Sequence, residues 1–120
     1  MKRTGPTNIH LRLLISYLKK KSRENGANIW RKVAEYLEKP TRNRVEVNIW
    51  KINKYTVNGD TVVVPGKVLG SGFLNHKVTV AAWSFSQKSK EKILKAGGNI
   101  LTIDKLIEIN PKGSNIKILV

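Results

Sequence analysis

The sequence has 120 residues, 40% of them hydrophobic, and its 23 Lys and Arg against 8 Asp and Glu give a formal net charge of +15. A single domain of this length has enough apolar residues for a modest core, so the chain is not simply a disordered basic tail. The absence of cysteine excludes disulfides, Cys-based zinc sites and a thiol nucleophile, and no apolar stretch approaches the roughly 20 residues of a membrane span, so we expect a cytoplasmic protein.

The first 25 residues predict a helix with two different faces. Thr7 or Asn8 can cap a helix that begins near Ile9, and Asn25-Gly26 can end it. Apolar residues share one face and basic residues another at helical spacing, namely Leu11, Leu14, Ile15 and Leu18 against Arg12, Lys19 and Arg23. This helix can therefore pack inward and contact phosphate outward.

A second helix is predicted from its cap, Asn28, to Pro40, which cannot continue the helical hydrogen bonds. Its expected core residues are Ile29, Trp30, Val33, Tyr36 and Leu37. Residues 41–44 form a short basic connector to the next element.

The pattern changes to β-strands at residue 45. Val45, Val47 and Ile49 alternate with polar residues, which indicates a strand. The turn signal Asn58-Gly59-Asp60 precedes residues 61–64, which have the composition of a buried strand.

Pro65-Gly66 is expected to close that strand. Three glycines then predict a flexible loop over residues 66–72, with Lys67 inside it. Residues 77–85 are rich in β-forming residues and predict another strand. One side of it carries Val78, Val80 and Ala82.

The last third alternates between helices and short strands. Ser86, or Ser84 with Gln87 completing a capping box, starts a helix that Ile93 and Leu94 anchor. A strand over 99–101, a helix capped by Thr102, a turn over 111–115 and a strand over 116–120 follow. This order predicts an α/β fold with a basic, largely helical N-terminal part (residues 1–54) and an α/β core (residues 55–120) in one compact domain.

The positive charge is concentrated in the N-terminal part. Residues 1–54 hold fourteen Lys and Arg against four Asp and Glu, a net of +10, while residues 55–120 hold nine against four, a net of +5. Every arginine lies in the first part, and arginine suits phosphate because its planar group donates in pairs and stacks on bases. Nucleic acid is the polyanion that best explains this charge.

Most of the candidate RNA-binding residues are Lys and Arg residues of this N-terminal part. They are Lys2, Arg3, Arg12, Lys19, Lys20, Arg23, Arg31, Lys32, Arg42, Asn43, Arg44, Lys51 and Lys54, together with Lys67 of the glycine-rich loop and His76. Trp50 and Phe73 either stack on unpaired bases or pack within the protein, and Trp83 is expected in the core.

Chemical motifs do not indicate an enzyme. Val68 follows Lys67 where a phosphate-binding loop needs Ser or Thr for magnesium. His10 and His76 lack the neighbours of a metal site or a catalytic triad, and no carboxylates converge. We expect no cofactor, no metal and no small-molecule substrate. The weaker alternatives are a DNA-compacting chromatin protein, a nucleic-acid-processing enzyme and a membrane-surface peptide.

Several segments, in order along the chain, resemble the archaeal and eukaryotic family of large-subunit ribosomal protein L18e. They are Arg3-Thr4-Gly5-Pro6-Thr7-Asn8, the run GDTVVVPGKVLGSG over Gly59–Gly72, Phe85-Ser86, Lys92-Ile93 with Ala96-Gly97-Gly98, and Asn110-Pro111-Lys112-Gly113. The long glycine-containing run is the most specific of them, and the short chain is similar to archaeal members.

The resemblance implies a domain shared with bacterial protein L15, built of irregular strand-strand-helix turns. It implies a structural constituent of the large subunit that binds large-subunit ribosomal RNA, lies beside neighbouring large-subunit ribosomal proteins and has no catalytic activity. The matched segment 3–8 and the loop 66–72 add Thr4, Asn8 and Ser71 to the expected RNA-binding residues.

Overall fold

The computed structural model describes residues 9–39 and 45–120. The elements in chain order are α1 (Ile9–Asn25), α2 (Asn28–Leu37), β1 (Val45–Asn48), α3 (Ile49–Tyr55), β2 (Asp60–Leu69), β3 (Val78–Phe85), α4 (Gln87–Lys95), β4 (Asn99–Thr102), α5 (Ile103–Ile109) and β5 (Ile116–Ile118). The predicted α/β class, with helices preceding the sheet, is confirmed. The caps expected at Thr7 and Asn8 lie outside the described residues.

Strand β2 is the centre of a five-stranded sheet in which the pairings are parallel. One edge of β2 pairs with β3, and β3 pairs with β4. The other edge is shared, because residues 61–63 pair with β5 and residues 66–69 pair with β1. The five residues 62–66 are therefore all buried, as expected for a parallel strand covered on both faces.

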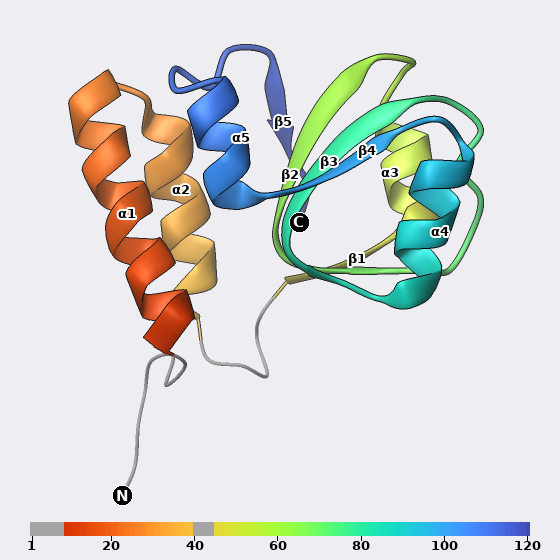
Figure 1. Ribbon diagram of the computed structural model, residues 1–120, viewed down its shortest axis with the longest axis horizontal. Coiled ribbons are helices and arrows are strands. Elements are labelled where there is room, and N and C mark those ends of the chain that lie inside the picture. The colour runs from red at the N-terminus through yellow and green to blue at the C-terminus, as the bar shows by residue number, and fades with distance from the viewer. Residues whose placement is uncertain (1–8, 40–44) are drawn as a thin grey trace, which may run out of the picture.

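Helices cover both faces of the sheet and enclose two hydrophobic cores. Figure 1 shows α1, α2 and α5 on one side of the strands and α3 and α4 on the other. Val63 belongs to the core under α1, α2 and α5, whereas Val62 and Val64 belong to the second core. Val78, Val80 and Ala82 share that second core, so their predicted common side is confirmed.

Trp30 joins α2 to the C-terminal part of the chain. Its side chain is fully buried, as predicted, and its Nε1–H donates to the carbonyl oxygen of Pro111 at 2.7 Å. Trp83 is only partly buried at the edge of the same core. The helical pair α1–α2 is therefore fixed to the sheet domain through buried side chains.

The prediction that Pro65-Gly66 closes a strand was wrong, because β2 continues to Leu69. A register shift between Val64 and Lys67 accommodates the proline, which has no N–H for the ladder. Glycine is required at 66 because a Cβ there would lie 2.1 Å from the carbonyl oxygen of Val45 on β1. Lys67 consequently lies in a strand and not in a loop.

Three other local predictions were also wrong. Ile49 does not end strand β1 but begins α3, where Ile49 and Ile52 are both buried at helical spacing. Asn28 is the first residue of α2 and not its cap. Leu94 is more than half exposed, so Ile93 alone anchors α4, while the predicted cap Ser86 accepts the N–H of Ser89 at 3.1 Å.

Candidate nucleic-acid interface

Seven predicted RNA-binding residues lie outside the described part of the chain: Lys2, Arg3, Thr4, Asn8, Arg42, Asn43 and Arg44. The other eleven fall into two groups, apart from Lys67 on β2. One group lies on α1 and α2, and the second lies on α3 and the connection between β2 and β3. Figure 1 shows α1 and α3 toward opposite ends of the longest axis, which is 42 Å, so the fold does not bring these groups together.

The first group lies on the α1–α2 hairpin. Leu11, Ile15 and Leu18 of α1 are buried against the core that also contains Val33 and Leu37 of α2, which fixes the pair of helices. Gly26 makes the turn between them with a φ of 61°. A groove of about 470 Å³ runs between the helices, and its lining includes Lys19, Arg23 and Arg31.

Carboxylates neutralise some of the hairpin cations. Lys19 Nζ lies 2.6 Å from Glu38 Oε2, and Arg31 Nε lies 3.4 Å from Glu35 Oε2. Lys20 lies 3.9 Å from Glu24. Each of these cations is partly or largely exposed, so the ion pairs are weak and a phosphate can compete for them.

Arg12, Arg23 and Lys32 are exposed and form no ion pair or hydrogen bond with the residues of ranges 9–39 and 45–120. They are thus available for anions without breaking an internal contact. Lys21 behaves differently, since its ion pair with Glu24 at 3.2 Å raises the pKa of the lysine. Arg12, Arg23 and Lys32 are therefore the predicted hairpin cations that have no partner among the described residues.

The second group surrounds the β2–β3 loop, which we define as residues 70–77. Three asparagines spaced five residues apart hold its backbone. The Oδ1 atoms of Asn48, Asn53 and Asn58 accept the N–H groups of Ser71, Asn75 and Lys77 at 3.2, 3.2 and 3.1 Å. The Ser71 carbonyl in turn accepts the N–H of Trp50 at 3.0 Å.

Two further side chains fasten the β2–β3 loop. Lys92 Nζ of α4 donates to the carbonyl oxygens of Gly70 and Gly72 at 2.5 and 2.7 Å. Thr56 donates its hydroxyl to the carbonyl oxygen of Ile52 at 2.6 Å, so its oxygen accepts from His76 Nε2 at 2.7 Å. The predicted loop over residues 66–72 is shorter than expected, because residues 66–69 lie in β2.

These contacts give His76 and Ser71 an internal role. His76 Nδ1 also lies 3.0 Å from Asn75 Oδ1, so both ring nitrogens have partners inside the protein. Ser71 uses both its backbone groups to hold the loop on α3. A contact of either residue with RNA stays a prediction.

Two aromatic side chains at this end of the molecule are exposed to solvent, one in the loop and one on α3. Phe73 is 83% exposed, and Trp50 is 50% exposed on α3 beside Gly72. A groove of about 370 Å³ joins Phe73 to Lys95 on α4. Phe73 is thus available for stacking and is not packed in the core. Lys95 was not among the predicted RNA-binding residues, because its charge alone does not show that it lies beside an aromatic ring.

The remaining cations of this group have mixed roles. Lys51 Nζ donates to the carbonyl oxygen of Val120 at 2.5 Å, and Lys54 Nζ lies 5.4 Å from the centre of the Tyr55 ring. Lys67 is exposed on β2. Lys54 and Lys67 therefore add positive charge to the surface. The ammonium group of Lys51 forms a hydrogen bond with Val120 inside the protein.

Within ranges 9–39 and 45–120, no three His, Asp or Glu side chains are arranged to hold a metal ion. Over the same ranges, no helix is long and apolar enough to cross a membrane.

The comparison with known families decides the identity. A family model described as "Ribosomal protein 60S L18 and 50S L18e" matches residues 1–120. The chain belongs to this family. It is a ribosomal protein of the large subunit and not an enzyme, as the resemblance of the sequence segments implied.

Archaeal L18e relatives are similar over nearly the whole chain. The large ribosomal subunit protein eL18 of Methanothermobacter thermautotrophicus is 56% identical over 113 residues, covering 94% of this chain and 93% of the relative. The protein of the same name from Pyrobaculum aerophilum is 50% identical over 117 residues, covering 98% and 96%. That from Methanoregula boonei is 52% identical over 113 residues, covering 94% and 93%.

Proposed function

We propose that this L18e protein binds large-subunit ribosomal RNA as a structural constituent of the cytoplasmic ribosome, with the α1–α2 hairpin as its main phosphate-binding surface. The observation that carries the proposal is the set Arg12, Arg23 and Lys32, which are exposed on a rigid pair of helices and have no ion partner among the described residues. Cations fixed in this way can neutralise phosphates without losing an internal contact.

The second contact is the end of the molecule formed by α3, the β2–β3 loop and α4. Phe73 is held outward by a backbone with many hydrogen bonds, so it is preorganised to stack on an unpaired base. Lys95, which lines the same groove, supplies the charge for the adjoining phosphate. Two contacts at opposite ends would allow the protein to join separate segments of RNA.

The test is the salt dependence of binding to a large-subunit ribosomal RNA transcript. Each lost phosphate contact should reduce the slope of log K against log salt by about 0.7 to 0.9. The variant Arg12→Gln/Arg23→Gln should therefore reduce the slope by about 1.5. Filter binding between 50 and 300 mM KCl would measure it.

The matched control is Lys105→Gln/Lys112→Gln, which removes the same charge from exposed positions outside the hairpin. It should leave the slope within experimental error of the parent. Equal slopes for the two double variants would refute the hairpin as the phosphate-binding surface. Competition with duplex DNA at equal phosphate concentration should leave most of the protein on the RNA.

A further inference from the structure

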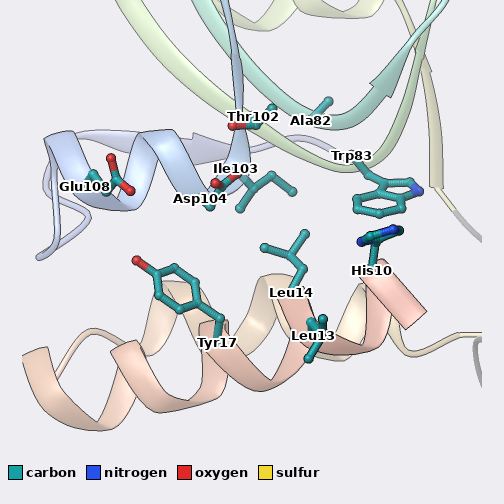
Figure 2. Close-up of a pocket in the computed structure, with 10 residues that line it drawn as sticks. All are labelled: His10, Leu13, Leu14, Tyr17, Ala82, Trp83, Thr102, Ile103, Asp104 and Glu108. Carbon is teal, nitrogen blue, oxygen red and sulfur yellow. The ribbon is translucent and has the colours of Figure 1, made fainter. Parts of the chain in front are cut away.

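A cleft of about 570 Å³ lies between α1 and α5, beside the end of β3. Figure 2 shows Leu14 and Tyr17 of α1 pointing toward Ile103 and Asp104 of α5, with Trp83 at one end, and Leu13 and Glu108 also line the cleft. None of these residues was selected from the sequence as an RNA ligand. The cleft shares α1 with the hairpin, but its lining does not include Arg12, Arg23 or Lys32.

The walls of the cleft expose apolar groups. Leu13, which lines the cleft, is 61% exposed. Trp83 is half-buried, and Figure 2 shows the His10 imidazole lying against its indole ring. Exposed apolar groups gathered around a concave surface are typical of protein interaction sites.

The rim of the cleft is acidic, in a chain of net charge +15. Asp104 and Glu108 lie one turn apart on α5, are exposed, and have no ion pair or hydrogen bond with the described part of the chain. By contrast, Glu24, Glu38 and Asp60 are all paired with lysines. The cleft thus combines apolar walls with two carboxylates that have no counter-ion among residues 9–39 and 45–120.

We propose that this cleft docks a basic polypeptide segment of a neighbouring protein of the large subunit. An apolar side chain of the segment would pack on Leu13 and Trp83, and its Lys or Arg would pair with Asp104 and Glu108. Charge complementarity selects this occupant, because unpaired carboxylates repel RNA phosphates but attract cationic side chains. The proposal does not depend on the hairpin as the RNA-binding surface.

The experiment replaces Leu13 with the photo-reactive residue p-benzoylphenylalanine and irradiates intact large subunits that contain the variant. Because Leu13 is largely exposed, the replacement is compatible with the fold. The expected adduct joins position 13 to a Lys- and Arg-rich segment of another protein, identified by mass spectrometry after nuclease and protease digestion. An adduct with RNA, with residues 1–8 of the same chain or with a second copy would overturn the proposal, as would no adduct after the benzophenone is consumed.

A pair of charge variants tests the electrostatic part. Asp104→Asn/Glu108→Gln in the photo-reactive background should reduce the protein adduct at least fivefold per incorporated chain. The control Glu46→Gln/Glu91→Gln removes two carboxylates outside the cleft and should leave the adduct unchanged. Equal yields in both double variants would overturn the assignment of a basic partner.

Discussion

At the residue scale, Gly72 combines two requirements that a side chain cannot meet. Its φ of 105° lies in the region that L-residues rarely adopt, and a Cβ there would lie 2.5 to 2.8 Å from the Cβ, N and Cα atoms of Trp50. Gly59 also has a positive φ, of 90°, but has nothing within 4 Å of a Cβ. Alanine substitutions at the two positions therefore distinguish the effect of backbone strain from the effect of steric overlap.

We expect Gly72→Ala to lower the free energy of unfolding by about 3 kcal/mol, because strain and overlap add. Gly59→Ala should lower it by only about 1 kcal/mol, since strain acts alone. Urea unfolding followed by far-ultraviolet circular dichroism measures both. If Gly72→Ala lowered the free energy of unfolding no more than Gly59→Ala does, the close approach of α3 to the loop would not be maintained in solution.

The stability of the turn before β2 is expected to depend on pH through the carboxylate of Asp60. The N–H of Val57 donates to its Oδ2 at 2.8 Å, and Lys117 Nζ lies 2.9 Å from the same oxygen. The backbone hydrogen bond, and then the lysine, lower the pKa of the Asp60 carboxyl below its ordinary value. The ionised carboxylate therefore stabilises the folded chain above the pKa of the unfolded state.

The stabilisation should be present at pH 7 and should disappear as the pH falls below about 4 through the folded-state pKa. The urea midpoint of Asp60→Asn should accordingly lie below that of the parent at pH 7 and approach it at pH 2.5. Lys117→Gln should retain part of the effect, because the Val57 hydrogen bond remains. A difference between Asp60→Asn and the parent that is constant from pH 7 to pH 2.5 would contradict this role.

At the element scale, α3 and its flanking residues form the support of the β2–β3 loop. Asn48 precedes α3, Asn53 lies within it and Asn58 follows it, and each accepts a different backbone N–H of the loop. The spacing of five residues was visible in the sequence, but it is neither a helical nor a strand period. Only the fold shows that the three side chains point to one segment.

Removing one asparagine should release one part of the loop. In Asn53→Ala, the amide hydrogen of Asn75 should exchange with solvent about fivefold faster, since a net hydrogen bond contributes about 1 kcal/mol. The amide of Lys77, which is bound to Asn58, should not change. Asn58→Ala is the matched control with the opposite pattern, and nuclear magnetic resonance measures both. Equal acceleration of the two amides in either variant would mean that the loop opens as one unit.

At the scale of the whole molecule, the predicted RNA-binding cations among the described residues lie toward both ends of the fold (Figure 1). The hairpin cations lie toward one end, and Lys54 and Lys95 lie toward the other (Figure 1). A net charge of +15 on a chain of 120 residues destabilises the compact state through self-repulsion. Salt reduces this repulsion by screening the charges, whereas a bound polyanion neutralises them.

We expect the melting temperature of the free protein to rise by several degrees between 10 and 300 mM KCl, because screening reduces self-repulsion. At constant ionic strength, a ribosomal RNA transcript should raise it further, because we expect it to bind the folded chain more tightly than the unfolded chain. Differential scanning calorimetry would measure both effects. A melting temperature that falls with KCl would show that attractive ion pairs outweigh the repulsion.

The sequence alone determined the elements whose pattern is local. The helices around α1, α2 and α4, the buried strand at residues 61–64, the turn at Asn58-Gly59-Asp60 and the basic face of α1 were predicted because their residues interact within one or two turns or along one strand. The buried position of Trp30 followed from the same periodicity. Family membership could be inferred too, because it depends on sequence motifs.

Only the tertiary structure decided how β2 is shared between β1 and β5, why Gly66 is needed, and that Lys19 pairs with Glu38 and Lys117 with Asp60. It also decided that Phe73 is held outward and that Asp104 and Glu108 border an apolar cleft. These features depend on residues far apart in the chain, as in the hydrogen bond between Trp30 and Pro111 across 81 positions. A local pattern cannot encode such contacts, because they exist only after packing brings distant segments together.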